Sequence, residues 1–333
     1  MAEMAGSKRL RDYLSLAGVG VVALGLVCVN VLYGLGMIDR YYNGILTLIM
    51  INIILAVSLN LINGITGQFS IGHAGFMAVG AYVSAMLSIN AHWPFWAVLV
   101  SGMAAAAVMG LVVGIPSLRL KGDYLAIATL GFGEIIRVII VNLDVTGGPR
   151  GLPGIPFKTS FFIAEGLALL TVLLVVNLVN SAHGRAMLAI REDEIAAETM
   201  GVNATRFKVT AFTIGASLAG LAGGLYAHYM MFIDPKSFGF FKSIEILTMI
   251  VLGGLGSITG AILSAAVLTY LPELLRQFAM LRMVIYSALL IVMMLVRPQG
   301  LLGTWEVTDA LKRFGRRPAK SAKEGRGNVH GVA

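Results

Sequence analysis

The sequence predicts an all-α polytopic membrane protein with about eight transmembrane helices and one further re-entrant or broken helix pair. Three observations lead to this fold class. Hydrophobic residues make up 57% of the 333 residues and charged residues only 13%. The mean hydropathy is +0.84. Apolar runs recur along the chain at the length of about 20 residues that a helix needs to cross a bilayer, which is too often for a soluble core.

The predicted transmembrane domain covers residues 16–298. Its first run, 16–38, follows basic residues as a secretory signal would, but it exceeds the apolar core of about 7 to 15 residues that signals have and lacks a clear cleavage site. We therefore expect a retained span after a short cytoplasmic segment, residues 1–15. Hydrophobic patterning places the next spans at 42–63, 74–90, 95–115, 124–143, 161–180, 209–232 and 281–297.

The apolar run 244–270 is long enough to cross, but it contains the break GGLGSITG at 253–260. A crossing here would place the basic tail, residues 299–333, opposite the N-terminus and violate the positive-inside rule. We therefore expect two half-helices that enter and return, with Gly253 and Gly254 on an internal path. Both termini are then cytoplasmic. The net charge of +8 lies mainly beside anionic lipid and requires no nucleic-acid partner.

Residues 64–76, GITGQFSIGHAGF, place glycines and polar groups between two apolar runs. Non-helical backbone in a membrane is tolerated only where protein or water satisfies its polar groups, so such breaks tend to line a path. One interpretation assigns these residues to a translocation path, and the other is a plain cytoplasmic turn. The path residues would be Gly67, Gln68, Ser70, Gly72 and His73. No Cys, Asp or Glu beside the histidine completes a metal set, so we expect no metal site.

Two opposite charges lie inside the predicted span 124–143. Glu134 and Arg137 are three residues apart and share a helix face, so each can offset the cost of about 3 kcal/mol that an isolated charge carries at the membrane centre. The pair must face protein or water. A contact to the transported solute or to a gate is one interpretation, and a structural ion pair is the other.

Two of the loops between spans have distinctive compositions. The segment TGGPRGLPGIP, 146–156, lies on the expected outer face, and its proline and glycine density predicts an exposed loop without helix or strand. It is either a contact for something arriving from outside or a connector. The cytoplasmic loop 183–208 is the more informative, because good helix formers run from Ala186 to Met200.

The sequence of the loop 183–208 predicts one short helix over 186–200 that could dock a partner protein. Gly201 is placed to cap its C-terminus, and Asn203 can begin the next helix. Apolar and small residues fall on one side, namely Met187, Ile190, Ala197 and Gly201. The acidic cluster Glu192, Asp193 and Glu194 would be repelled by anionic lipid, so a helix that simply rests on headgroups is disfavoured.

Four stretches in fixed order carry a family resemblance: GITGQFSIGHAGFMAVGAY, RLKGDYLAIATLGFGEIIR, TGGPRGLPGIP and GRAMLAIREDEIAAETMGV. Over about residues 45–300 the chain resembles the LivM-type permeases of high-affinity branched-chain amino acid ABC importers. The loop also resembles the coupling loop of ABC-importer permeases, whose alanines and glycine would fall on Ala196, Ala197 and Gly201. That pattern's glutamate would fall on Ile195, with Glu194 one position early, which is a departure from the family.

The resemblance implies a permease subunit of a bacterial cytoplasmic (inner) membrane importer for leucine, isoleucine and valine. Its expected partners are a second permease of the same family, two cytoplasmic ATPases and a periplasmic substrate-binding protein. The ATPase contact would include Arg191, Glu192, Asp193, Glu194, Ala196, Ala197 and Gly201. This chain would bind no cofactor, since ATP and Mg belong to the ATPases and the sequence lacks G-x-x-x-x-G-K-[ST].

Other functions stay open at the level of sequence. Relatives with the same architecture are expected to carry urea, amides or other amino acids. An ion-coupled secondary transporter would use the broken helices with Glu134 and Arg137 as its coupling site. A membrane enzyme is disfavoured because neither H-E-x-x-H nor G-x-S-x-G occurs.

Overall fold

The computed structural model describes residues 40–117, 120 and 122–278, with a few isolated positions between 281 and 295. The predicted terminal segments 1–15 and 299–333 and the predicted span 16–38 lie outside the described residues. The predicted span 281–297 is described only at those isolated positions.

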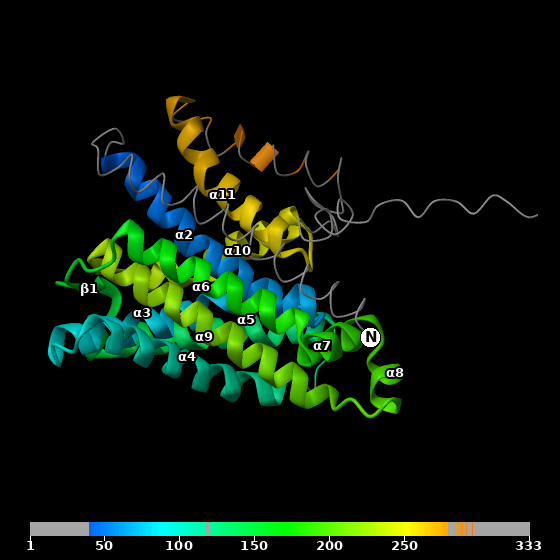
Figure 1. Ribbon diagram of the computed structural model, residues 1–333. Helices are drawn as coiled ribbons and strands as arrows, with labels where there is room; N and C mark the ends of the chain where they lie inside the picture. Colours follow the sequence, from blue (N-terminus) through cyan, green and yellow to red (C-terminus); the bar gives the residue numbers. More distant parts are fainter. Residues whose placement is uncertain are drawn as a thin grey trace, which may run out of the picture.

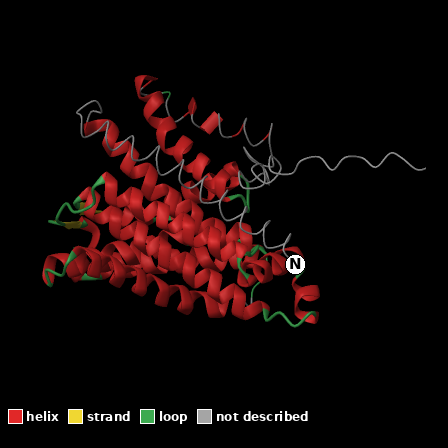
Figure 2. Cartoon of the chain, in the orientation of Figure 1, coloured by secondary structure: helices red, strands yellow, loops and turns green. Residues whose placement is uncertain are grey.

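Long helices lie side by side and make up nearly all of the described chain (Figures 1 and 2). The six longest are α2 (Arg40–Asn60), α3 (His73–Asn90), α4 (Phe95–Ser117), α5 (Asp123–Asn142), α6 (Phe161–Asn180) and α9 (Ala204–Met230). Among the described residues, five helical segments are long and apolar enough to cross a membrane: Tyr41–Ile65, Phe95–Ser117, Asp123–Asn142, Phe161–Asn180 and Ala204–Met230. The predicted all-α polytopic fold is confirmed.

Helix α9 lies at the centre of the bundle, packed on α3 and α4. Small residues allow the close approach: a Cβ on Gly220 would lie 2.5 Å from the Ala106 Cβ and 2.8 Å from the Gly102 carbonyl oxygen. A Cβ on Gly80 of α3 would collide with the backbone of Gly220. Backbones at this distance gain dispersion contacts that larger side chains would prevent.

The predicted broken helix pair is present as α10 (Phe240–Gly253) and α11 (Ile258–Leu274). The two helices are antiparallel. Gly253 contacts the backbone of Gly260 near the turn, and further from the turn the Ser264 hydroxyl of α11 donates to the Met249 carbonyl of α10. Two glycines in the turn have positive φ, 107° at Gly254 and 92° at Gly256, which other residues rarely adopt.

The two ends of the bundle differ. At the loop end lie α7 (Ala182–Glu192) and α8 (Glu194–Thr199), and at the strand end β1 (Leu152–Pro153) pairs antiparallel with β2 (Phe232–Ile233) (Figure 1). The prediction that 146–156 lacks helix and strand was wrong. Two 3₁₀ turns, η2 (Asp144–Thr146) and η3 (Gly148–Arg150), precede β1, which finds its partner in β2 about 80 residues later, beyond the reach of local sequence rules.

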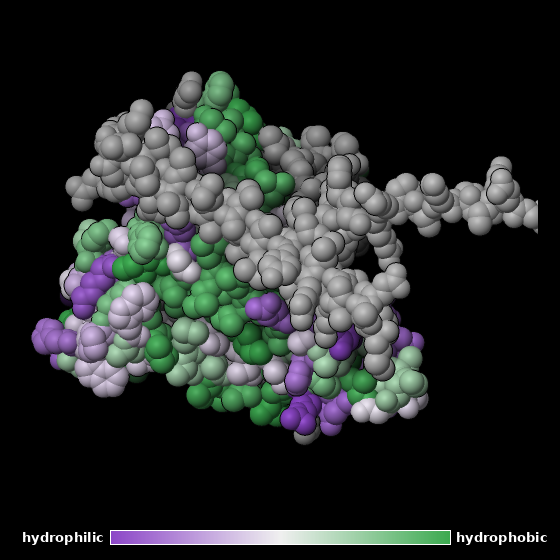
Figure 3. All heavy atoms as spheres, in the orientation of Figure 1, coloured by the Kyte–Doolittle hydropathy of each residue, from purple (hydrophilic) through white to green (hydrophobic). Residues whose placement is uncertain are grey.

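Apolar side chains cover the flank of the bundle, whereas hydrophilic ones gather towards its two ends (Figure 3). Exposed residues of this kind include Val108 on α4 and Ile127 and Ile135 on α5, which are 58%, 66% and 54% exposed. Such a flank suits contact with lipid, where apolar side chains need no burial against protein.

Candidate functional site

The loop 183–208 forms two helices rather than the single helix predicted over 186–200. The chain breaks at Asp193, whose backbone is extended (φ −155°, ψ 109°) and whose Oδ1 accepts a hydrogen bond from the Ala196 amide at 3.0 Å. An aspartate can satisfy a free helix amide in this way, which competes with continuing the helix. Asp193 is therefore the N-cap of α8.

The apolar side of the loop packs as the sequence predicts. Met187 is fully buried, and Ile190 and Ala197 are 4% and 6% exposed. Gly201 ends the turn after α8 with φ +85°, and Asn203 caps α9 by accepting from the Arg206 amide at 2.9 Å. The helical elements of the loop therefore have fixed positions on the bundle.

The acidic residues of the loop have separate partners. Glu194 forms an ion pair with Lys208 at 2.7 Å, whereas Glu192 pairs with the neighbouring Arg191 and remains 72% exposed. Two large apolar side chains are also exposed here, Ile195 at 71% and Met200 at 84%. Exposed apolar residues beside a charge at the end of a membrane bundle are typical of a protein-docking surface.

Arg191 points into the bundle rather than outward. Its Nη1 donates to the Gly64 carbonyl at 2.8 Å, and a Cβ on Gly67 would touch its Cγ at 3.0 Å. Gly64 belongs to η1 (Leu61–Ile65), a π-helical turn that extends α2. Because a Cβ on Gly256 would lie 2.6 Å from Nη1, Arg191 also faces the turn between α10 and α11.

Asn60, which the sequence analysis missed, joins the same turn to α2. Its Oδ1 accepts from the Gly256 amide at 2.9 Å, and its Nδ2 donates to the Ser257 carbonyl at 3.1 Å. The loop, the π turn and the α10–α11 turn are thus connected through two polar side chains. π turns within α-helices are frequent at functional sites.

The polar side chains of 64–76 lie inside the bundle. Gln68, Ser70 and His73 are each at most 1% exposed. The Gln68 Nε2 donates to Thr66 and to the Lys208 carbonyl, so this segment contacts α9. Gly67 is the exposed member of the set.

The start of α3 is fixed by similar contacts. The His73 Nε2 lies 2.8 Å from the Ser58 hydroxyl, while that hydroxyl also donates to the Leu55 carbonyl. A Cβ on Gly72 would collide with the Thr129 carbonyl of α5. The segment 64–76 therefore lies where α2, α3 and α5 pack closely together.

Glu134 and Arg137 form the predicted ion pair, with 2.7 Å between Oε2 and Nε. The structure adds a role that the sequence analysis missed. The Glu134 Oε1 accepts from the Phe240 amide at 3.1 Å and so caps the first turn of α10. A carboxylate at a helix N-terminus satisfies free amides and complements the helix dipole.

Helix α10 begins at mid-depth in the bundle. Its first amide meets Glu134 near the middle of α5, and Lys242 Nζ lies 3.4 Å from Asn52 Oδ1 near the middle of the span Tyr41–Ile65. It then runs to the loop end, where its turn meets Asn60. Half-helices that start near the membrane midplane form the binding sites of many transporters.

Lys242 and Glu245 on α10 pair at 3.1 Å and were not predicted as site residues from the sequence. The signal was present, since two charges interrupt the otherwise apolar stretch FFKSIEIL. Charged residues at membrane depth are costly and commonly functional.

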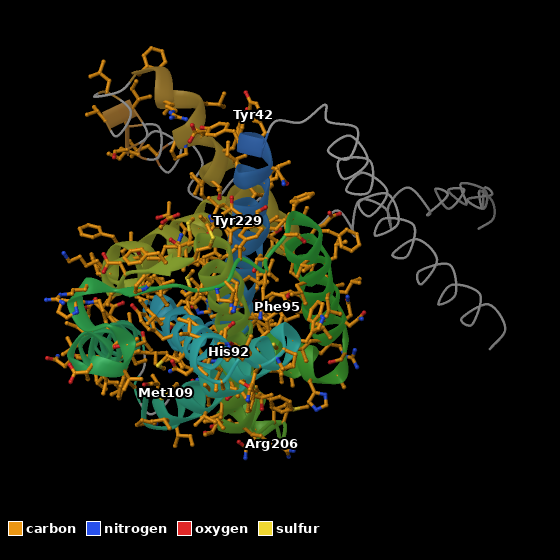
Figure 4. The ribbon with its side chains drawn as sticks, turned by 90° about the vertical axis from the view of Figure 1, so that its left-hand side faces the viewer. Tyr42, His92, Phe95, Met109, Arg206 and Tyr229 are labelled. Carbon is orange, nitrogen blue, oxygen red and sulfur yellow. The ribbon has the colours of Figure 1, made fainter. Side chains whose placement is uncertain are left out.

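A cleft of about 350 Å³ opens at the strand end, lined by Tyr41, Tyr42, Tyr270, Glu273, Leu274 and Arg276. Figure 4 looks onto this end, with Tyr42 at the tip of α2. Arg276 Nη1 donates to the Tyr41 hydroxyl at 2.8 Å and lies 3.2 Å from Glu273 Oε1. Within the described ranges, no group of three or more His, Cys, Asp or Glu could hold a metal ion.

Comparison with known proteins identifies the family. Residues 41–296 match the family described as branched-chain amino acid transport system / permease component. The chain belongs to this permease family. It is therefore a multi-pass membrane permease subunit of an ABC importer and not an enzyme, which decides against the ion-coupled and enzymatic alternatives.

Relatives of this permease carry matching names. It is 40% identical over 302 residues to the high-affinity branched-chain amino acid transport system permease protein LivM of Escherichia coli, covering 80% of this chain and 71% of that protein. LivM of Salmonella typhimurium is 39% identical with the same coverage. The permease protein LivH of Escherichia coli is 27% identical over 81% of this chain and 96% of its own length. No solved structure matches. Similarity to both LivM and LivH indicates a paired permease system.

Proposed function

We propose that this permease translocates leucine, isoleucine and valine across the bacterial cytoplasmic membrane, driven by ATP hydrolysed on two partner ATPases. A second permease of the LivH kind and a periplasmic binding protein complete the assembly. The substrate assignment rests on the names of the LivM relatives. ATP and Mg bind the ATPases, and this chain binds no cofactor.

The loop end is proposed as the cytoplasmic end, with both termini on that side. The observation that carries this proposal is the contrast between the two sides of α7 and α8. Met187 and Ile190 are buried against the bundle, while Ile195 and Met200 are exposed. An ATPase groove would bind the exposed side, together with Glu192.

Arg191 would transmit ATPase movement to the bundle. It contacts the π turn at Gly64 and faces the α10–α11 turn at Gly256, so a shift of α7 acts on both. The proposed path residues lie on or near these elements: Gly67, Gln68, Ser70, Gly72, His73, Gly253 and Gly254. Glu134 and Arg137 would act on the path indirectly, by fixing the start of α10. Direction would come from ATP and the loaded binding protein favouring different states of the bundle.

The docking proposal is tested by co-purification of the ATPases with this permease. We expect Ile195→Asp to lower the recovered ATPase about tenfold, since a carboxylate buried in an apolar groove loses its water. The matched control is Val145→Asp, a 66% exposed apolar residue at the strand end, which should leave recovery unchanged. Equal recovery with both variants would contradict docking at α8.

The transport proposal is tested in proteoliposomes that contain the whole assembly. Uptake of labelled leucine should require ATP on the ATPase side and persist with a protonophore. Excess valine should compete for uptake, whereas excess urea or acetamide should not. Competition by urea or an amide, without competition by valine, would refute the substrate assignment.

A further inference from the structure

The start of α10 places a compact set of polar groups at the middle of the bundle. Lys242 Nζ lies 3.1 Å from Glu245 Oε1 and 3.4 Å from Asn52 Oδ1. The Asn52 Nδ2 in turn donates to the Thr269 hydroxyl of α11 at 2.9 Å. Helices α2, α10 and α11 therefore each contribute a side chain. We call Asn52, Lys242, Glu245 and Thr269 the midplane polar cluster.

The midplane polar cluster retains hydrogen-bonding capacity. An ammonium has three protons, and Lys242 uses two of them on Glu245 and Asn52. A carboxylate has two accepting oxygens, and the contact with Lys242 uses only Oε1 of Glu245. The side chain of Glu245 is 41% exposed, whereas that of Lys242 is 18% exposed. A purely structural pair at this depth would be expected to bury and satisfy both groups.

Aromatic rings lie beside the cluster. The half-buried Tyr226 of α9 packs on Phe238, which lies two residues before the start of α10, at 5.9 Å between ring centroids. Tyr82 packs on Phe238 at 6.0 Å, and its buried hydroxyl has no hydrogen-bond partner among the described residues. These aromatic rings therefore lie near the start of α10, the helix that carries Lys242 and Glu245.

We propose that the midplane polar cluster binds the main-chain groups of a zwitterionic aliphatic amino acid during transport. The substrate carboxylate pairs with Lys242, its ammonium pairs with Glu245 and Asn52, and its side chain lies towards the ring of Tyr226. The exchange keeps the site neutral: the Lys242–Glu245 pair opens, and each member gains an opposite charge from the substrate, which limits the cost of separating charges in a membrane. This inference rests on the proposed import of branched-chain amino acids.

The test compares Glu245→Gln and Lys242→Met with the wild type in the assembled importer. Loaded binding protein is present at saturation, and both leucine uptake and ATP hydrolysis are measured. We expect each substitution to lower uptake by at least about tenfold, while the stimulated ATP hydrolysis stays within about twofold, because the ATPase contact is unchanged. Glu273→Gln is the control, since it removes the acid of another i, i+3 pair, at the strand-end cleft.

The charge-swapped variant, with Lys242→Glu and Glu245→Lys together, separates a substrate contact from a structural pair. The two exchanged side chains can still form an ion pair with each other. Each position, however, presents the wrong charge to its end of the substrate, so we expect uptake to stay low in an assembled complex. Full recovery of uptake by the swap would overturn the proposal, as would wild-type uptake in both single variants. A larger loss with Glu273→Gln would move the site to the strand-end cleft and also overturn it. Failure of the wild type itself to import leucine with ATP would instead refute the proposed function.

Discussion

Substitution of Gly220 by alanine should separate α9 from α4. The added Cβ would lie 2.5 Å from the Ala106 Cβ and 2.8 Å from the Gly102 carbonyl oxygen, whereas ordinary contacts begin at 3.4 Å. Neither neighbour can rotate away, because one is a Cβ and the other is backbone, so α4 must retreat by roughly 0.6 to 0.9 Å to restore ordinary contacts. Overpacking of this kind costs about 1–3 kcal/mol. The loss of dispersion contacts along the α4–α9 seam adds to that cost.

The measurement is the apparent melting temperature of the purified permease in detergent, with Gly166→Ala of α6 as the matched control. Nothing lies within 4 Å of a Cβ on Gly166, so alanine there adds helix propensity without a clash. With a shift of about 2–4 °C per kcal/mol, Gly220→Ala should melt several degrees below the wild type. The control should melt at or above the wild-type temperature. Equal melting of Gly220→Ala and wild type would refute the close packing of α4 and α9.

Three further predictions concern the sites. Gly201→Ala should cost about 1–2 kcal/mol, because φ is +85° with open space around the Cβ, and should raise hydrogen exchange in α8 about tenfold. Glu134→Ala should loosen α10 by about 1–3 kcal/mol, seen as faster exchange of the Phe240 amide, whereas Glu134→Gln should retain an acceptor and most protection. Arg191→Met should lower leucine taken up per ATP hydrolysed, because it removes the bond to the Gly64 carbonyl. It also removes the ion pair with Glu192, but that carboxylate is already largely exposed, so ATPase recovery should stay unchanged. Loss of ATPase recovery would instead place Arg191 in the docking surface.

The loop 183–208 shows how much of a structure local sequence rules can predict. Helical spacing predicted that Met187, Ile190 and Ala197 share a buried side, and glycine chemistry predicted the positive φ of Gly201. The same rules missed the break at Asp193. Helix propensity treats an aspartate as a weak helix former, while its ability to cap α8 depends on the geometry of the bond to Ala196.

Within the bundle, local sequence rules predict less, because the important polar contacts join residues far apart in the chain. The pairing of Glu134 with Arg137 follows from their spacing, but the second role of Glu134 requires α10 to arrive from a position 106 residues later in the chain. Asn52 and Lys242 likewise meet only in the folded bundle. No periodicity connects such partners, since their proximity depends on how whole helices pack.

The sequence by itself determined that the chain is a bundle of membrane helices, roughly where the described ones lie, and that a glycine turn breaks the run 244–270. These features follow from hydrophobic length and backbone freedom, which are local properties. Only the tertiary structure decided where the broken helix begins, which charges it places at mid-depth and that Arg191 faces inward. Those features depend on the close approach of α2, α5, α7 and α10, which are far apart in sequence and meet through specific polar contacts.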